Sequence, residues 1–578
     1  MTRLFVPNPI RTFVISASAC TFLYGCASAP QQEDASELRP QPAPQQVADR
    51  SFTTESLYAL LVAEMAIDRK RYDIALNNYV QQAAATRDPN VTAQATRIAR
   101  ILKAHQPALE MAQLWMELEP NNSDAQLIAS AELIEANRLD DALAISEQLL
   151  AQDEATAFDA IAVKAADNDL ASVTSLLARY ESLAARHPQN YQLQLGLSVL
   201  LQRAERNDEA LAAIKRAQKL EPDNVRAGFQ ESRILQQMGQ QDLALDKLAV
   251  LVEENPENIG LRARYARILA GTDIQASREQ FTILNKQSPG DRDILFSLAL
   301  VEMESGHLAE AEEHFLQLLQ RGYYQSAAHY HLGMIYDKRQ DMAPALEHLL
   351  QVEQGPNYLA AMAKATEILA RLNRSQDAIA VLQTQRPQVD PAYREGLYMI
   401  ESDVLSGTGQ MLDAETVLTT GLSEFPDSTR LLYARAMLYS RIDNMSAAEQ
   451  DLKQILALTP DNAAALNALG YTLADKTDRL EEAYLYIKRA YELTPDDAAV
   501  MDSMGWVQYR LGNLKEAIEQ LRAALKAMPD HEIAAHLGEV LWVSGVRDEA
   551  REIWRSGLEL NPRSAIIRET MQRLKAEM

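Results

Sequence analysis

The chain has 578 residues, and its 81 acidic residues against 56 basic ones give a formal net charge of −25 at pH 7. A surface this acidic repels polyanions, which argues against nucleic-acid binding. Hydrophobic residues make up 47% of the chain and aromatic residues only 6%, a composition that suits a long core of closely packed, Ala- and Leu-rich helices.

The first residues have the pattern of an export signal. Arg3 and Arg11 give a positively charged region before a short, mostly apolar stretch at 12–24, which is too brief to span a bilayer. The sequence Leu-Tyr-Gly-Cys, which ends at Cys26, resembles the bacterial lipobox, where a signal peptidase cuts before a cysteine whose sulfur carries diacylglycerol. Only Tyr24 departs from the small residue that is usual in this motif.

The lipobox resemblance implies a cellular location. Residues 1–25 are then a signal peptide, and Cys26 becomes the acylated first residue of the mature protein. Two or more acyl chains give a stable membrane anchor. The residue that follows is Ala27 rather than Asp, which in this class of lipoproteins favours the outer membrane, here its periplasmic face in a Gram-negative bacterium. The alternative is an ordinary secretory signal with a coincidental cysteine.

A tether follows the cysteine. Gln, Pro, Ala, Ser and Glu dominate residues 26–52, which carry too little apolar surface to fold. The prolines favour extended conformations, so we expect this linker to be disordered and to hold the folded part away from the membrane.

From residue 53 onward one small residue recurs every 33 to 36 positions. This spacing is typical of a solenoid of helix–turn–helix repeats, in which small residues let neighbouring helices approach closely. We call the fifteen recurring positions the ladder. Thirteen of them are alanine, and Leu176 and Ser277 occupy the other two. The other ladder positions are Ala75, Ala108, Ala142, Ala210, Ala244, Ala311, Ala345, Ala378, Ala414, Ala448, Ala483, Ala517 and Ala550.

The residues around the ladder resemble the tetratricopeptide repeat. One copy reads His329-x2-Leu332-Gly333-x2-Tyr336 and continues with Ala345-x3-Leu349. The resemblance implies an all-α fold, a tetratricopeptide-type superhelix of about fifteen repeats over 53–563. Residues 564–578 keep a single apolar stripe, which predicts a capping helix with one face in solvent.

The residues that end and cap helices are not equally clear in all repeats. Prolines end several second helices, and we expect the following acids and amides to cap the next ones: Asp223, Asn224, Asp461, Asn462, Asp496 and Asp530. The repeat pattern is weak at 153–185 and at 260–289. Two prolines and the run Gly407-Thr408-Gly409 predict a turn and a mobile loop or change of curvature near 385–410.

The sequence contains no motif that is typical of an enzyme active site. The nine histidines form no metal-binding motif, and His329 and His331, two residues apart, point to different sides of a helix. There is no nucleophile elbow, and the sequence predicts no catalytic residue, metal, cofactor or small-molecule substrate. Function is therefore expected to be protein binding.

By resemblance to the family, the first helix of each repeat lines a concave groove. The inward positions carry aromatic residues, which are good anchors for a partner, and arginines, which are suited to an acidic or C-terminal carboxylate group. The alternative is that several of them pack against the neighbouring repeat. The candidates are Phe229, Phe296, Tyr330, Tyr433, Tyr471, Trp506, Tyr509, Arg226, Arg233 and Arg430.

The whole arrangement resembles the large outer-membrane tetratricopeptide lipoproteins that bind a carboxyl-terminal processing serine protease. The resemblance implies an adaptor that brings this periplasmic protease together with substrates such as cell-wall hydrolases. The alternative is a scaffold for envelope export or assembly, for example of pili, exopolysaccharide or outer-membrane proteins.

Overall fold

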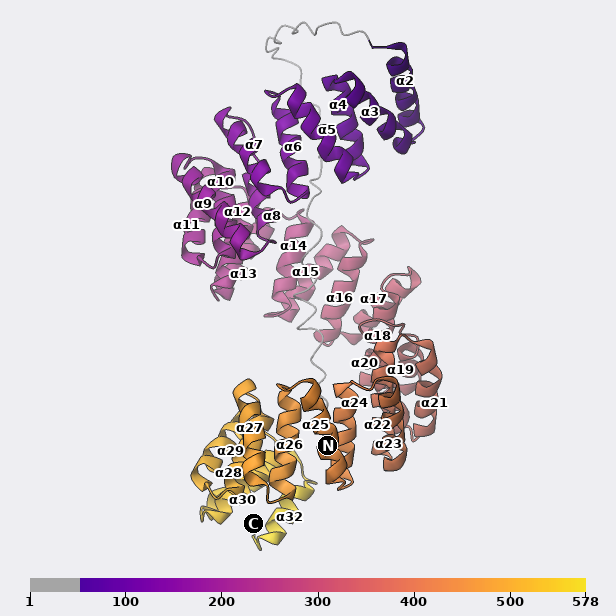
Figure 1. The fold of residues 1–578 in the computed structure, drawn as a ribbon, viewed down its shortest axis with the longest axis vertical. Coiled ribbons are helices and arrows are strands. Elements are labelled where there is room, and N and C mark those ends of the chain that lie inside the picture. The colour runs from indigo at the N-terminus through magenta and orange to yellow at the C-terminus, as the bar shows by residue number, and fades with distance from the viewer. Residues whose placement is uncertain (1–51, 578) are drawn as a thin grey trace. The chain divides into compact units, whose positions relative to one another are not determined.

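The computed structural model describes residues 52–577, so the predicted signal peptide, Cys26 and nearly all of the predicted linker lie outside the described residues. Between these limits the chain forms 31 α-helices and no strand (Figure 1). The all-α prediction is therefore confirmed. None of these helices combines the length and the apolar character that crossing a bilayer requires.

The helices fall into two compact units, which meet in sequence between Ser305 and Gly306. The described part of the N-terminal unit holds α2 to α16. Its helices are α2 (Thr54–Asp68), α3 (Tyr72–Thr86), α4 (Pro89–Ile101), α5 (His105–Leu118), α6 (Ser123–Glu135), α7 (Leu139–Ala151), α8 (Phe158–Ala165), α9 (Leu170–Arg186), α10 (Tyr191–Arg203), α11 (Asn207–Leu220), α12 (Val225–Gln237), α13 (Gln241–Glu254), α14 (Ile259–Leu269), α15 (Ile274–Gln287) and α16 (Arg292–Glu304).

The C-terminal unit holds α17 to α32 and one short 3-10 helix, η1 (Arg386–Gln388). Its α-helices are α17 (Leu308–Gln320), α18 (Gln325–Lys338), α19 (Met342–Leu349), α20 (Tyr358–Arg371), α21 (Ser375–Gln385), α22 (Pro391–Gly407), α23 (Met411–Glu424), α24 (Thr429–Arg441), α25 (Met445–Leu458), α26 (Ala463–Lys476), α27 (Leu480–Leu493), α28 (Ala498–Arg510), α29 (Leu514–Ala527), α30 (His531–Val543), α31 (Arg547–Leu560) and α32 (Ala565–Arg573).

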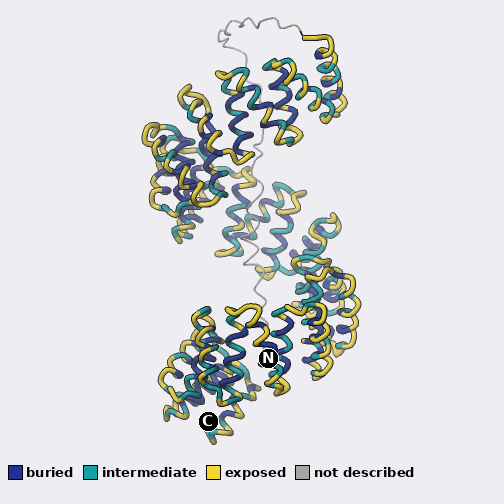
Figure 2. Tube along the Cα trace, in the orientation of Figure 1, coloured by how far each residue is buried: buried dark blue, intermediate teal, exposed yellow. Residues whose placement is uncertain are grey.

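All fifteen ladder residues lie on the odd-numbered helices from α3 to α31, the second helices of the repeats, and all are buried. Dark blue buried segments accordingly recur in helix after helix in Figure 2. Ser277 keeps its place because its hydroxyl donates a 2.7 Å hydrogen bond to the Ala266 carbonyl on the first helix of its own repeat. A small polar residue is tolerated in this position because its one polar group is satisfied.

Glycines let the two helices of a repeat approach closely. A Cβ atom on Gly333 of α18 would lie 2.5 Å from Cγ of Leu349 on α19, and one on Gly505 of α28 would lie 2.5 Å from Cγ of Leu521 on α29. Leu349 and Leu521 each stand four residues after a ladder alanine, so the sequence motif and the packing agree. Any side chain at these glycines displaces the second helix.

Three of the predicted caps form as expected. The side chains of Asn224, Asn462 and Asp530 accept hydrogen bonds from backbone amides in the first turns of α12, α26 and α30. In α28 the cap is Asp497 rather than Asp496, so the prediction was one residue early. Helix ends read from sequence alone commonly carry errors of this size.

Of the two alternatives predicted near 385–410, the mobile loop is wrong, and the change of curvature stays a prediction. Pro391 occupies the first turn of α22, where a proline has no helical hydrogen bond to lose, and the helix then runs for 17 residues to Gly407. The prolines therefore mark a helix start. The turn predicted after it is confirmed, because Gly409 has a positive φ of 81°.

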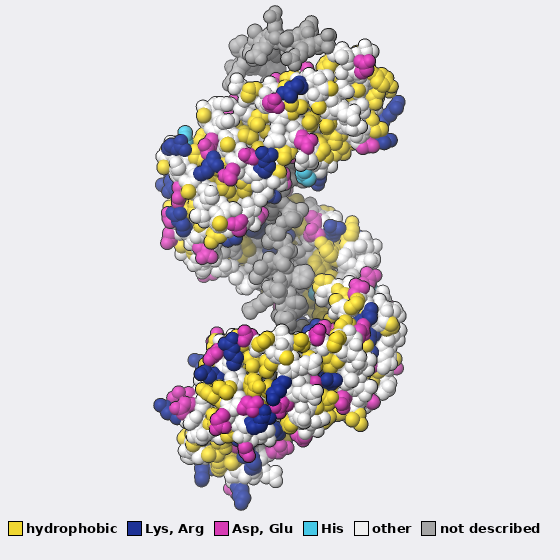
Figure 3. Space-filling view, viewed as in Figure 1, with side chains coloured by type: hydrophobic (Ala, Val, Ile, Leu, Met, Phe, Trp, Pro, Cys, Tyr) yellow, Lys and Arg dark blue, Asp and Glu magenta, His cyan; other side chains and the backbone are white. Residues whose placement is uncertain are grey.

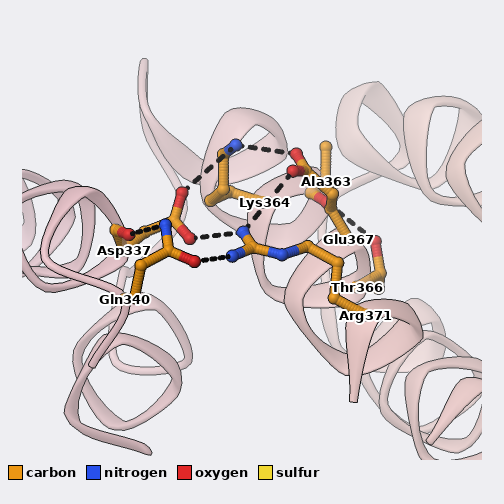
Figure 4. A network of polar contacts seen from close by, with 7 residues as sticks. All are labelled: Asp337, Gln340, Ala363, Lys364, Thr366, Glu367 and Arg371. Carbon is orange, nitrogen blue, oxygen red and sulfur yellow. Dashed lines mark hydrogen bonds and ion pairs between the residues drawn. The ribbon is translucent and has the colours of Figure 1, made fainter. Parts of the chain in front are cut away.

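Polar contacts join the first helices of consecutive repeats. In Figure 4, Arg371 of α20 donates to Asp337 of α18 at 2.7 Å and to Gln340, in the turn that follows α18, at 2.8 Å. Lys364 bridges Asp337 and Glu367 at 3.5 and 2.7 Å. These contacts hold α18 and α20 in a fixed register.

At the C-terminal end, α32 packs its apolar side against α30 and α31. Ile567 is fully buried, Met571 and Leu574 are partly buried against the same cluster, and the Ser564 side chain caps the helix. The remaining faces of α32 are mostly polar or charged, as the sequence pattern indicated.

Candidate functional site

Side chains from the first helices α26, α28 and α30 and from α32 meet in one cluster of the C-terminal unit. We call it the C-terminal surface and define it as Tyr471, Asp502, Trp506, Tyr509, His536, Glu539 and Arg573. Three of the predicted anchors, Tyr471, Trp506 and Tyr509, are thus brought together. On the face seen in Figure 3, apolar and charged side chains are interspersed across this unit.

An imidazole and a carboxylate occupy the middle of the C-terminal surface. His536 Nδ1 lies 2.9 Å from Asp502 Oδ2, and its Nε2 lies 3.3 Å from the Tyr471 hydroxyl. Burial alone would lower the pKa of His536, but the charge and hydrogen bond of Asp502 outweigh burial, so the pKa is raised above its ordinary value. The imidazole ring stacks on Trp506 with 4.3 Å between ring centroids. The pair therefore favours a charged imidazolium against an aromatic face.

A second polar group lies beside the first. Arg573 of α32 donates to both oxygens of Glu539 at 2.9 and 2.5 Å, and the Tyr509 hydroxyl donates to Glu539 at 3.1 Å. Glu539 is buried. The burial of Tyr509, together with the negative charge of Glu539, raises the pKa of Tyr509 to about 12. The fork of hydrogen bonds fixes the Tyr509 ring, which stays partly exposed.

Trp506 forms the floor of this surface. It is only 7% exposed, its ring centroid lies 5.2 Å from that of Tyr509, and its indole nitrogen has no hydrogen-bond partner among the described residues. Tyr471 and Tyr509 are less deeply buried. An incoming side chain would therefore meet the two tyrosines first, over a rigid tryptophan.

The N-terminal unit has a second cluster, on α12 and α14. Arg226 donates to Asp159 at 2.7 Å, and the Arg264 guanidinium lies 4.3 Å from the centroid of the Phe229 ring. Arg233 makes a long contact of 3.5 Å with the Gln230 side-chain oxygen. Three of the predicted residues, Arg226, Phe229 and Arg233, thus lie along one helix, with Arg264 from the next repeat over the ring.

Comparison with known proteins supplies the family. The tetratricopeptide repeat model TPR_16 matches residues 177–225, 296–358, 433–498 and 503–568. TPR repeat-containing protein PA4667 of Pseudomonas aeruginosa is 40% identical over 490 residues, which cover 85% of this chain and 83% of that protein. The chain belongs to the tetratricopeptide repeat family.

Solved tetratricopeptide and related structures overlap the chain to different extents. A thermophilic TPR protein of Thermus thermophilus, TTC0263, is 24% identical and covers 31% of this chain and 98% of its own length, with a TM-score of 0.29. Cut9, in its hetero-tetramer with Hcn1, is 13% identical and covers 90% of this chain and 96% of its own, with a TM-score of 0.33.

The tetratricopeptide repeat fold is typically a scaffold for protein–protein interaction rather than a catalyst. In this family member, no three or more His, Cys, Asp and Glu side chains of residues 52–577 are grouped as metal ligands. His329 pairs with His348 through ring nitrogens 2.9 Å apart, and burial lowers the pKa of both.

Four predicted anchors have no place in the polar contacts of the two clusters, although Tyr433 shares a large hydrophobic core with Tyr471, Trp506 and Tyr509. Tyr330 and Tyr433 are partly buried in separate hydrophobic clusters, and burial raises the pKa of each phenol. Arg430 is exposed and lies 4.0 Å from Glu395. Phe296 is partly buried on α16. Their part in binding stays a prediction.

The sequence reading missed His536, Glu539 and Arg573. The repeat period itself contained the signal, because Asp502 and His536 are 34 residues apart, as are Glu539 and Arg573. Residues one period apart occupy equivalent places in consecutive tetratricopeptide units, so opposite charges at that spacing are brought into contact.

Proposed function

We propose that this protein is a lipid-anchored adaptor at the periplasmic face of the outer membrane. In this role it binds a carboxyl-terminal processing protease and delivers substrates such as cell-wall hydrolases. Membership of the tetratricopeptide family supports a scaffold, and the lipobox-like sequence at Cys26 with the linker that follows supports a membrane anchor.

The C-terminal surface is the observation that most supports partner binding. Its tyrosines are partly exposed, and their positions are fixed by buried charged groups. Rigid, partly desolvated aromatic side chains contribute strongly to binding because little conformational entropy is lost when a partner contacts them.

The anchor and the partner can be tested in one purification. Tagged protein is recovered from cell membranes, and the proteins that accompany it are identified by mass spectrometry. We expect a periplasmic processing protease. The Cys26→Ser variant is expected to leave the membrane fraction yet still to capture the protease, because the array is unchanged.

Two results would contradict the proposal. The adaptor role fails if no processing protease is recovered reproducibly, and the anchor fails if Cys26→Ser stays in the membrane fraction. A scaffold for envelope export predicts that deletion of the protein abolishes a surface structure. An adaptor instead predicts that deletion stabilises particular periplasmic proteins.

The two tyrosines give a sharper prediction. Replacing both Tyr471 and Tyr509 with alanine is expected to lower protease affinity by about tenfold or more, since aromatic anchors of this kind contribute about 2 kcal/mol or more. Glu539 keeps its two bonds from Arg573, so the fold should survive. Affinity is measured with purified proteins by surface plasmon resonance.

The matched control is Leu485→Ala, on the second helix α27, where the side chain is 66% exposed. This variant is expected to bind like the wild type. Equal affinity of the double tyrosine variant and the wild type would remove the C-terminal surface from the proposal.

A further inference from the structure

Three neighbouring guanidinium groups of the N-terminal unit lie without an acidic partner. Arg233 of α12 and Arg264 and Arg267 of α14 have no carboxylate within 4.0 Å among the described residues. Other arginines of the chain, such as Arg206 and Arg479, each contact two carboxylates. We call Phe229, Arg233, Arg264 and Arg267 the arginine surface.

The charges of the arginine surface oppose one another. Burial lowers the pKa of Arg264 to about 10, and the positive charges of Arg233 and Arg267 add to this effect. Burial also lowers the pKa of Arg233, against the weaker and opposite influence of Asp167. Like charges held together and partly desolvated cost free energy unless an anion joins them.

The surroundings leave hydrogen-bond donors available. The central carbon of the Arg264 guanidinium lies 4.3 Å from the centroid of the Phe229 ring. The ring contacts the flat face of the guanidinium, so the N–H groups at its edge stay available. Arg233 has only the long contact of 3.5 Å to the Gln230 side chain. Each guanidinium has five N–H donors, so most of this capacity is unused.

We infer that the arginine surface binds the acidic side chains of an extended segment of a partner protein, with an apolar residue of that segment against Phe229. Three cations spread over two consecutive first helices match several carboxylates along a segment, whereas a single terminal carboxylate neutralises only one charge. A polynucleotide is disfavoured because the whole chain carries −25. The inference rests on the proposed adaptor function only for the identity of the partner.

The test uses the purified full-length protein in detergent and a short fluorescent peptide, acetylated and amidated, in which Glu and Asp alternate with Leu and Ala. Fluorescence anisotropy measures its affinity. We expect Arg233→Gln with Arg264→Gln to weaken binding by about tenfold or more, because charge-assisted hydrogen bonds are lost. A peptide with Gln and Asn in place of the acids is expected not to bind.

The matched control removes two charges from the same unit at Lys215 and Lys219, both exposed on the second helix α11. Lys215→Gln with Lys219→Gln changes the net charge equally and is expected to alter affinity by less than about twofold. A charge-reversed pair, Arg233→Glu with Arg264→Glu, is expected to bind a Lys-substituted peptide, which separates lost recognition from lost folding.

Three outcomes would overturn the inference. They are equal binding of the acidic and neutral peptides, equal weakening by the lysine control, and arginine-dependent binding of only a neutral peptide with a free terminal carboxylate. Because no protease takes part in this measurement, it can fail while the adaptor proposal stands, and the reverse also holds.

Discussion

Replacing Trp554 with alanine is expected to destabilise the C-terminal unit by about 3–5 kcal/mol, the usual cost of removing a large aromatic side chain from a core. Trp554 of α31 is fully buried, and its indole nitrogen donates to the Ala535 carbonyl at 3.4 Å. It packs directly on Gly538 of α30, which has no side chain, and its ring centroid lies 5.6 Å from that of Trp542. Alanine would leave a cavity between these two helices.

Urea denaturation followed by circular dichroism measures the loss, and hydrogen exchange locates it. Stability in a repeat array is largely a sum of neighbouring terms, so amides of α30 to α32 should lose protection while those of α4 to α7 keep theirs. Leu485→Ala, at an exposed position, is expected to change stability by less than about 0.5 kcal/mol. A loss below about 1 kcal/mol for Trp554→Ala would show that α30 and α31 are held by other contacts.

The fold was predictable because the same constraint acts once in every repeat. A side chain at Ala345 or Ala483 must be small wherever two helices of a repeat touch, so the requirement reappears at a fixed spacing. Repetition also identifies an exception from its position alone. Ser277 occupies a ladder position, and its hydroxyl donates a hydrogen bond to the Ala266 carbonyl. Prolines were less informative, since Pro391 starts a helix as readily as a proline ends one.

The candidate surfaces were predictable only in part. The register on the first helices placed Tyr471, Trp506 and Tyr509 together, but it gave no indication of how deeply each is buried. Burial depends on neighbours from two other helices, such as His536 over the Trp506 ring. Arg264 was not among the predicted residues, although its guanidinium lies over the Phe229 ring.

The repeat period also places opposite charges in contact. Asp337 and Arg371 are 34 residues apart and bonded, as are Asp502 and His536. In both pairs the two residues come from the first helices of consecutive repeats, so a search for opposite charges one period apart finds both from sequence. The Asp502–His536 pair differs from the other because one of its members is a histidine, whose charge depends on pH and whose pKa is raised here.

Asp502→Asn is therefore expected to remove a pH dependence from the C-terminal unit. The folded-state pKa of His536 is raised above the value of about 6.5 for an unfolded chain. Its contribution to the free energy of unfolding is thus fully present below pH 6.5 and is lost as pH rises through the folded-state pKa. With Asn at 502, burial lowers the pKa of His536 against the smaller opposing charges of Asp475 and Glu539. The cost at pH 6.5 should be about 1.5–3 kcal/mol, the range for hydrogen bonds to charged groups.

The range above pH 6.5 separates this histidine from three buried histidines of the same unit. Burial lowers the pKa of His329, of His348 and, to about 4, of His331, so their effects on stability vary only below the unfolded-chain value. Urea midpoints are measured between about pH 6.5 and 9 by tryptophan fluorescence, since three of the four tryptophans belong to this unit. The wild type should lose stability across this range, the Asp502→Asn variant should not, and Asp496→Asn, at an exposed carboxylate, should follow the wild type. A wild-type midpoint that stays constant would mean that His536 is neutral when folded, and Asp502 would then only orient the ring on Trp506.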